Sequence, residues 1–382
     1  MEAKFTKTVL ISHFPIPYKG IASWTTLLKN LLLNKKGLID YIICPYKDFD
    51  KTVDIQNTNH ILIEEPRYFR YKIERIIKHY RFYTYWNAVK KLLDEYDSLV
   101  LMIVDNPGIL KAIDYYAKKH KLKKRIRIIF FMHAYHYFLS PEDLERFYLS
   151  MDNLVLLSKS SYRFQITQGH SLPTEVDIIY NGIDSKKFKP PTPAEKKELR
   201  TKYAINNNRL IFLWLSQDRP KKGIQIILNA WNKIAERHNN AELFIVGTHN
   251  EVTGKNIRSF GKISNDLLPD YYRVSDFYLF STLCHEGHPM SLTEAIKSGC
   301  TCLASNIEPI DEIMGNGRYG RLVDFPNNVQ CWIETIEEEI DKYITNDRCN
   351  PYLDKIPEKL YDLDDWCDNV ERLVEKWKKR LL

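Results

Sequence analysis

Two glutamates are the side chains of this sequence best placed to do chemistry. Glu286 and Glu294 are eight positions apart in the segment CHEGHPMSLTEAIKSGC, residues 284–300. Two carboxylates can serve as the acid and base of a glycosidase. Here one precedes a predicted helix that begins near Pro289, and the other lies in the second turn of that helix. We therefore expect each carboxylate to hydrogen-bond ligand hydroxyls, and Gly287 lets a ligand approach the backbone closely.

A basic turn is the second candidate. Arg219 and Lys222 lie between a predicted strand and a helix that opens after Gly223. A helix N-terminus presents free N–H groups and the positive end of its dipole, which suits a phosphate. Taken alone, this segment is better explained as a solvated basic turn. A third segment, VDIIYNGIDSKKFKP (176–190), ends a strand in an Asn-Gly turn.

The elements that position these residues alternate between short β-rich runs and amphipathic helical runs. We predict strands at 8–14, 41–44, 60–63, 99–104, 126–132, 154–157, 177–180, 210–215, 242–247, 257–261, 276–281 and 301–305. Predicted helices lie between them, for example at 23–33, 71–93 and 109–119. Continuous apolar strands separated by helices indicate parallel sheets that are covered on both faces. The sequence therefore predicts an α/β fold of two doubly wound, Rossmann-like domains.

The domain boundary is predicted in the polar stretch 185–198, where two adjacent prolines stop regular structure. We assign residues 1–184 to an N-terminal domain and residues 185–363 to a C-terminal domain. The last segment, 364–382, predicts an amphipathic helix whose acids lie at its start and whose bases lie at its end. That charge distribution suits the helix dipole.

Composition narrows the class of protein. The chain has 382 residues, of which 44% are hydrophobic and 27% charged, and this excludes a disordered chain or a coiled coil. A net charge of +7 is too small for a dedicated nucleic-acid binder, but it suits contact with phosphates or an anionic membrane surface.

Seven cysteines without a C-x-x-C pair indicate neither a disulfide framework nor a zinc cluster. The N-terminus reads as a strand rather than a signal peptide, and no run is long enough to span a membrane, so we expect a cytoplasmic protein.

Three segments follow one another in a specific order and spacing. An NGID turn with Phe188 and Pro190 comes first, then a basic K-G turn that opens a helix, then E-G-x-P with a second glutamate at the eighth position. This order resembles the family 4 glycosyltransferases, specifically across 176–325 and more loosely over the first half. The resemblance implies the GT-B fold, with two domains facing across a cleft and a C-terminal helix that crosses back to the N-terminal domain. It also implies transfer of a sugar from a nucleoside-diphosphate sugar to an acceptor hydroxyl, with retained anomeric configuration and without a metal.

The resemblance implies roles for individual residues. Lys222 matches the lysine that binds the donor diphosphate, and Glu294 matches the glutamate that holds the ribose hydroxyls. Glu286 matches the glutamate at the donor sugar, and His133 matches an N-terminal-domain histidine that reaches this sugar. Further donor contacts are expected from the loops and main chain at Gly20, Lys262, Ile263, Gly287, His288, Pro289, Met290, Ser291 and Leu292. The expected donor is a UDP- or GDP-sugar, with no other cofactor.

Two positions depart from the family pattern. The usual arginine six residues before the lysine is Ser216 here. We expect Arg219 to replace it, because a guanidinium can fork onto phosphate oxygens from a shifted turn. The first loop carries one glycine, Gly20, where a pair is common. A histidine after a strand, such as His133, is more often structural than functional, and the family match reverses that preference.

The segment 67–91 carries eight Lys or Arg residues and eight aromatic residues. As a helix it has an apolar face (Ile73, Ile76, Ile77 and Tyr80) and a basic face (Lys72, Arg75, Lys78 and Arg81). Such a helix can lie on an anionic membrane, contact RNA, or pack with its basic face in solvent. Because many acceptors of the family are lipid-linked, we favour the membrane surface.

The expected partners are therefore a nucleotide-sugar donor, a glycan or lipid-linked acceptor, and an anionic membrane at its inner face, with no nucleic acid. Synthesis of an envelope polysaccharide, such as capsule or O-antigen, is the setting that the family suggests. Two alternatives remain open. One is another GT-B enzyme, such as a sugar-nucleotide epimerase. The other is a non-catalytic subunit that binds a nucleotide or scaffolds a partner, which is motivated by Ser216 in place of the arginine.

Overall fold

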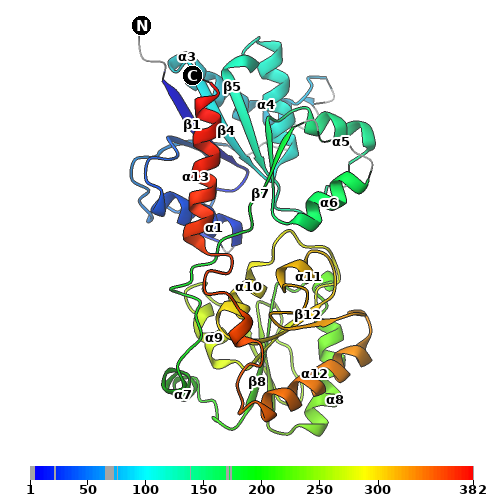
Figure 1. Cartoon of the computed structure of the whole chain (residues 1–382). Coiled ribbons are helices and arrows are strands. Elements are labelled where there is room, and N and C mark those ends of the chain that lie inside the picture. The colour runs from blue at the N-terminus through cyan, green and yellow to red at the C-terminus, as the bar shows by residue number, and fades with distance from the viewer. Residues whose placement is uncertain are drawn as a thin grey trace. The chain divides into compact units, whose positions relative to one another are not determined.

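The computed structural model describes residues 5–20, 23–64, 73–74, 76–137, 139–168, 172 and 174–381 (Figure 1). The chain divides into two compact units. Unit 1 comprises Met1–Gly182 and Asp364–Leu382, and unit 2 comprises Ile183–Leu363. Each unit has one parallel sheet flanked by helices, so the predicted class of two parallel-sheet α/β domains is confirmed.

Unit 1 has, in its described residues, a seven-stranded parallel sheet of order β3-β2-β1-β4-β5-β6-β7. Its strands are β1 (Thr6–Ser12), β2 (Tyr41–Pro45), β3 (Asn59–Ile63), β4 (Ser98–Val104), β5 (Ile126–Phe131), β6 (Asn153–Leu156) and β7 (Glu175–Ile178). Every residue of the central strand β4 is buried, as expected for a parallel strand covered on both faces. The strand order reverses between β1 and β4, and ligands of such sheets bind beyond the carboxyl ends of the strands at this break.

The helices of unit 1 include α1 (Ser23–Asn34), α3 (Tyr83–Glu95), α4 (Pro107–Lys119), α5 (Pro141–Tyr148), α6 (Lys159–Thr167) and α13 (Leu363–Lys379). Short 3-10 turns are η1 (Tyr80–Phe82) and η2 (Lys123–Arg125). Helix α13, red in Figure 1, joins this unit from the far end of the chain. Lys35 Nζ lies 2.7 Å from a carboxylate oxygen of Glu371, and Lys376 Nζ lies 2.6 Å from one of Glu175. These ion pairs hold α13 against unit 1, where the predicted fold places it.

Unit 2 has a six-stranded sheet of order β10-β9-β8-β11-β12-β13 in the part of the chain that is described. Its strands are β8 (Leu210–Leu215), β9 (Ala241–Val246), β10 (Ile257–Gly261), β11 (Phe277–Phe280), β12 (Thr301–Ser305) and β13 (Arg321–Val323). Its helices are α7 (Pro193–Lys202), α8 (Ile224–Arg237), α9 (Leu268–Val274), α10 (Met290–Lys297), α11 (Ile310–Ile313), α12 (Val329–Thr345) and the 3-10 turns η3 (Pro220–Lys222) and η4 (Leu353–Lys355). The order reverses between β8 and β11, which are adjacent.

One predicted helix is partly wrong. The sequence predicts a continuous helix over 71–93, but α3 begins only at Tyr83. The backbone of His79 has a left-handed φ of 61°, which a right-handed helix cannot contain, and a 3-10 turn follows it. The predicted apolar and basic faces of 67–91 therefore do not belong to one helix. Lys72 and Arg75 lie outside the described residues.

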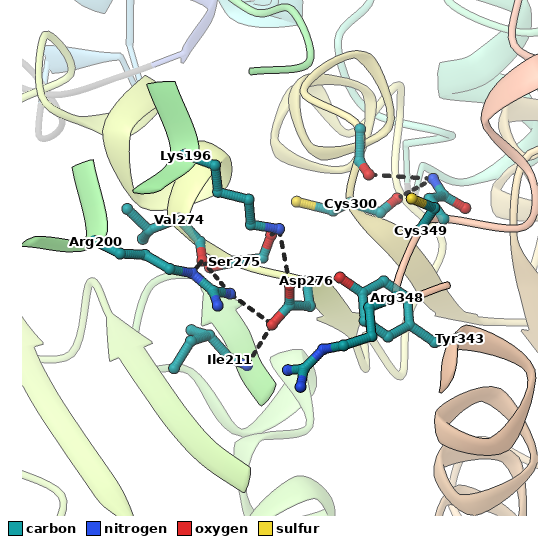
Figure 2. A network of polar contacts seen from close by, with 12 residues as sticks. Lys196, Arg200, Ile211, Val274, Ser275, Asp276, Cys300, Tyr343, Arg348 and Cys349 are labelled. Atoms are coloured by element: carbon teal, nitrogen blue, oxygen red, sulfur yellow. Dashed lines mark hydrogen bonds and ion pairs between the residues drawn. The ribbon is translucent and has the colours of Figure 1, made fainter. Parts of the chain in front are cut away.

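A buried polar network anchors the amino end of β11 (Figure 2). The carboxylate of Asp276 accepts hydrogen bonds from Lys196 Nζ, Arg200 Nη2 and the Tyr343 hydroxyl at 2.7 Å each, and from the backbone N–H of Ile211 at 2.8 Å. Burial alone raises the pKa of this carboxyl, but the two cations outweigh it and lower the pKa to about 2. The network joins α7, α12 and β8, so Asp276 is a structural residue at the end of the strand opposite to the ligand-binding edge.

Candidate functional site

The fold brings together two of the predicted site residues at the break in the sheet of unit 2. Lys222 Nζ forms an ion pair with Glu286 Oε1. Lys222 ends η3, which follows β8, and Glu286 lies in the loop between β11 and α10. The side chains are only 19% and 17% exposed. Because β8 and β11 are neighbours at the break, their carboxyl ends place a cation and a carboxylate side by side, although 64 residues separate them.

Gly223 makes the close approach of the basic turn possible. Its φ is +71°, and a Cβ at this position would overlap the carbonyl oxygen of Ser281. Gly223 also caps the N-terminus of α8, so the free N–H groups of that helix begin next to Lys222. The hydroxyl of Ser281 donates a hydrogen bond to the carbonyl of Lys222 at 3.0 Å and accepts one from Trp214 Nε1 at 3.0 Å. The turn is therefore fixed to the end of β11 through its main chain.

Glu294 lies in the second turn of α10 and is largely buried. Its Oε2 accepts a hydrogen bond from the Tyr272 hydroxyl at 3.0 Å. Burial raises the pKa of the Glu294 carboxyl to about 7, although the Tyr272 hydrogen bond and the charge of Lys187 act in the opposite direction. Near neutral pH this carboxyl exchanges between its neutral and ionised forms. It can therefore gain or lose charge when a polar ligand binds.

The loop from Gly287 to the start of α10 lies between the two glutamates. His288 is buried, its Nε2 lies 3.2 Å from the Thr293 hydroxyl, and burial lowers its pKa to about 3, so its imidazole is neutral. Pro289 caps the N-terminus of α10, whose first residue is Met290. Ser291 is partly exposed, whereas the side chain of Leu292 is buried in the core. Leu292 has no exposed surface, so neither its side chain nor its backbone is open to a ligand in this structure.

Several predicted contacts lie on the surface. The side chain of Arg219 is exposed and makes no hydrogen bond or ion pair with any described residue. Lys262 is exposed and Ile263 is half-buried, and both directly follow β10. Gly20 is exposed in the loop after β1, where a Cβ would overlap the ring of Tyr18. Within unit 2, the backbone N–H of Lys222 donates a hydrogen bond to the carbonyl of Arg219 at 2.8 Å, and no side-chain contact of Arg219, Lys262 or Ile263 with the Lys222–Glu286 pair is seen among the described residues.

In unit 1, His133 follows β5 near the break in that sheet. Its backbone N–H donates to Asp105 Oδ1 at 3.3 Å, and the same oxygen accepts from the Tyr137 hydroxyl at 2.5 Å. Burial lowers the pKa of His133, opposed by the charge of Asp105. The Trp24 ring lies 5.8 Å from that of His133 and 5.7 Å from that of His13, which follows β1. Polar and aromatic side chains thus gather at the carboxyl ends of β1, β4 and β5.

Sequence reasoning missed part of this cluster. Asp105 directly follows the predicted strand 99–104, so its place at the end of a strand was a usable signal. It has a left-handed φ of 49°, a conformation that non-glycine residues adopt mostly where the surroundings enforce it. Trp24 and Tyr137 carried no local signal of function. Their importance depends on which strands are neighbours.

Three further observations bear on the predicted chemistry. Among the described residues, no group of three or more His, Cys, Asp and Glu side chains is placed to hold a metal ion. None of the described helices combines the length and apolar character needed to cross a bilayer. The seven cysteines are all free thiols.

Part of the chain is similar to known glycosyltransferases. Residues 195–355, most of unit 2, match the family model described as "Glycosyl transferases group 1". Spore coat protein SA of Bacillus subtilis is 22% identical over 54% of this chain and 60% of its own length. Phosphatidyl-myo-inositol mannosyltransferase of Mycolicibacterium smegmatis is 26% identical over 41% of each chain. UDP-Gal:alpha-D-GlcNAc-diphosphoundecaprenol alpha-1,3-galactosyltransferase of Escherichia coli is 24% identical over 50% of this chain and 52% of its own. The chain spans about half the length of the curated relatives it matches.

Solved structures cover almost the whole chain. Anabaena HepE in complex with UDP superposes with a TM-score of 0.75 at 14% identity, covering 97% of this chain and 100% of that one. Sucrose-phosphate synthase from Thermosynechococcus elongatus superposes with a TM-score of 0.76 at 12% identity, covering 98% and 100%. At these identities the likeness shows the fold alone. The chain has the two parallel-sheet α/β domains of the GT-B fold, as predicted.

Proposed function

We propose that this protein is a retaining, metal-independent glycosyltransferase of family 4 type, which moves a sugar from a UDP- or GDP-sugar to an acceptor hydroxyl. One observation carries the proposal: Lys222 and Glu286 form an ion pair at the break between β8 and β11, two residues before the start of α8 and four residues before the start of α10, respectively. A lysine that suits a diphosphate and a carboxylate that suits a sugar are thus close enough to serve one ligand.

The chemistry follows from where charge develops. As the anomeric bond breaks, positive charge grows on the sugar and negative charge grows on the diphosphate. Lys222, the exposed Arg219 and the N–H groups at the start of α8 stabilise the departing diphosphate. In the ligand-free protein Glu286 neutralises Lys222, so the diphosphate takes the place of that carboxylate. A phosphate held by fixed cations and amides needs no metal ion.

The two glutamates of unit 2 orient the donor. Glu286 accepts hydroxyls of the sugar, and Glu294 accepts the ribose hydroxyls in its ionised form. In unit 1, the lowered pKa of His133 keeps its ring neutral and able both to donate and to accept a hydrogen bond, which suits contact with a sugar hydroxyl.

A lipid-linked acceptor at the inner face of a membrane is the second part of the proposal. The relative from Escherichia coli is named for a diphosphoundecaprenol acceptor, and that from Mycolicibacterium smegmatis for a phosphatidyl-inositol. In unit 1, Ile76 is 87% exposed and Ile77 45% exposed, next to Lys78. Exposed apolar and basic side chains together favour an anionic membrane surface. Replacing Lys78 and Arg81 with Glu should release the protein from anionic liposomes, and unchanged binding would exclude this contact.

The test of the proposed activity has two arms. UDP- and GDP-sugars are screened for thermal stabilisation and for hydrolysis or transfer, because a ligand that binds the native state raises its melting point. Lys222→Ala should lower turnover by several hundredfold, equivalent to about 3–4 kcal/mol for one preorganised group, without unfolding the protein. Lys221→Ala, which removes the neighbouring exposed cation, is the matched control and should keep most activity. Equal losses in both variants would remove the specific role of Lys222.

The same screen separates the alternatives. A non-catalytic subunit would be stabilised by a nucleotide without turnover of any donor. A sugar-nucleotide epimerase would convert the donor sugar without an acceptor and would release no nucleoside diphosphate as the end product. Release of UDP or GDP that depends on an added acceptor supports the transferase.

A further inference from the structure

Glu286 is held by a hydroxyl that the sequence analysis did not single out. Thr282 lies two residues beyond β11 and is 1% exposed. Its Oγ1 donates a hydrogen bond of 2.8 Å to Glu286 Oε1, the oxygen that also contacts Lys222. Within the described part of the chain, no side chain or backbone group bonds to Glu286 Oε2. The carboxylate is thus fixed through one oxygen, and the other is left for a ligand.

Glu286 depends more on its hydrogen bond from Thr282 when a diphosphate enters the site. A phosphate carries more negative charge than a carboxylate and competes with Glu286 for the Lys222 ammonium. Once Lys222 turns to the phosphate, the hydroxyl of Thr282 is the strong donor that stays on Glu286. The thiol of Cys284, 4.0 Å from the same oxygen, is a weak donor and does not substitute for it. A hydrogen bond to an ionised acceptor is stronger than one between neutral groups.

The local structure keeps Thr282 in place while its neighbours move. Ser281, the preceding residue, binds the carbonyl of Lys222 and is itself bound by Trp214. Consecutive residues at the end of one buried strand therefore hold the main chain of Lys222 and the side chain of Glu286. A strand end is a more rigid support than a loop, because the packed sheet fixes its direction.

We propose that Thr282 is a positioning residue that anchors Glu286 through Oε1. When the Lys222 ammonium leaves Glu286 to pair with the diphosphate, this anchor keeps Oε2 in place to accept a hydroxyl of the donor sugar. The inference rests on the proposed function and deepens it. When a nucleotide sugar breaks the ion pair between Lys222 and Glu286, it supplies a new partner to each, because its phosphates pair with Lys222 and its hydroxyls pair with Glu286. A free nucleoside diphosphate satisfies only Lys222, so the site favours the donor over the spent nucleotide.

Two variants separate the hydroxyl of Thr282 from its shape. Thr282→Val keeps the branched side chain and removes the donor, whereas Thr282→Ser keeps the donor and removes the methyl group. For each we would measure kcat/KM for the best nucleotide sugar and Kd for the corresponding nucleoside diphosphate alone. We expect Thr282→Val to lower kcat/KM by about 10- to 100-fold, the effect of one hydrogen bond to a charged group, with Kd changed by less than about twofold. Thr282→Ser should recover most of kcat/KM.

A matched control is Thr301→Val. Thr301 is a fully buried threonine at the amino end of β12, and its hydroxyl has no hydrogen-bond partner. This variant makes the same chemical change in the same sheet and should leave kcat/KM and Kd unchanged. Melting temperatures of all three variants report whether a loss of activity is a loss of folding.

Each alternative result overturns the inference in a recognisable way. Equal kcat/KM for wild type and Thr282→Val means that Glu286 does not need the hydroxyl. Equal losses in Thr282→Val and Thr282→Ser mean that the methyl group, not the donor, matters. A Kd for the nucleoside diphosphate that weakens as much as kcat/KM means that the whole site has collapsed. If the wild-type protein binds no UDP- or GDP-sugar, the proposed function fails and this inference fails with it.

Discussion

Replacing Glu294 with glutamine should stabilise the ligand-free protein at neutral pH and make its stability less dependent on pH. Burial raises the pKa of this carboxyl from 4.5 to about 7 in the folded protein. The folded state therefore keeps a proton on Glu294 over a range where the unfolded chain has already lost it. Glutamine matches the size of the neutral carboxyl and still accepts the hydrogen bond from Tyr272, but it does not ionise.

The sign and size of the effect of Glu294→Gln on the free energy of unfolding follow from proton linkage. Between pH 4.5 and about 7 the folded state binds more protons at this site than the unfolded state, so the free energy of unfolding falls as pH rises. Each pKa unit corresponds to about 1.4 kcal/mol. A shift of about 2.5 units therefore costs the folded wild-type protein about 3 kcal/mol above pH 7, and nothing below pH 4.5. Glu294→Gln removes this loss.

The assay is urea unfolding followed by tryptophan fluorescence at pH 5, 6, 7 and 8 for wild type and Glu294→Gln. The difference in unfolding free energy should grow in favour of the variant as pH rises. Glu198→Gln, a change to an exposed glutamate on α7, is the matched control and should show no such trend. A difference that stays constant from pH 5 to 8, or one that shrinks, would refute the reasoning about Glu294.

The same carboxyl links pH to nucleotide binding. If ribose hydroxyls bind the ionised form, the ligand must lower the pKa of Glu294, and affinity for UDP or GDP must rise with pH up to about 7. Calorimetric titration of the wild type at pH 6 and 8 measures this directly. Glu294→Gln should bind more weakly at both values and lose the pH dependence.

Further predictions concern the network at β11, the basic turn and the metal requirement. Asp276→Asn should destabilise unit 2 by about 3–5 kcal/mol, because it leaves the buried Arg200 and the partly buried Lys196 without their counter-charge; chemical unfolding measures this. The folded pKa of about 2 lies below the usual 3.8, so the contribution of Asp276 should persist above pH 4 and disappear as pH falls towards 2. Gly223→Ala should lower the melting temperature and turnover together, because the new Cβ overlaps the carbonyl of Ser281; an unaffected variant would contradict the close approach. Activity should survive EDTA, since Lys222 and helix N-termini carry the charge stabilisation; a loss that Mg²⁺ or Mn²⁺ restores would refute this.

Most of the sheet structure could be predicted because parallel strands carry their own signal. A strand buried on both faces must be apolar throughout, so runs such as the one in β4 stand out from the amphipathic helices around them. Strand β13 escaped prediction because its three residues, one of them exposed, are too short for such a pattern. The helix over 71–93 was extended too far, because apolar periodicity does not reveal a left-handed residue such as His79.

The sequence by itself determined the two α/β domains and the residues that suit a phosphate and a sugar. Lys222, Gly223, Glu286 and Glu294 were singled out by residue type and position near strand ends and helix starts, and the order and spacing of their segments, through the family resemblance, implied their roles. Only the tertiary structure decided that Lys222 pairs with Glu286 and that Thr282 holds the same carboxylate oxygen. These contacts depend on β8 lying next to β11, and strand order is set by the packing of the whole sheet rather than by any local pattern.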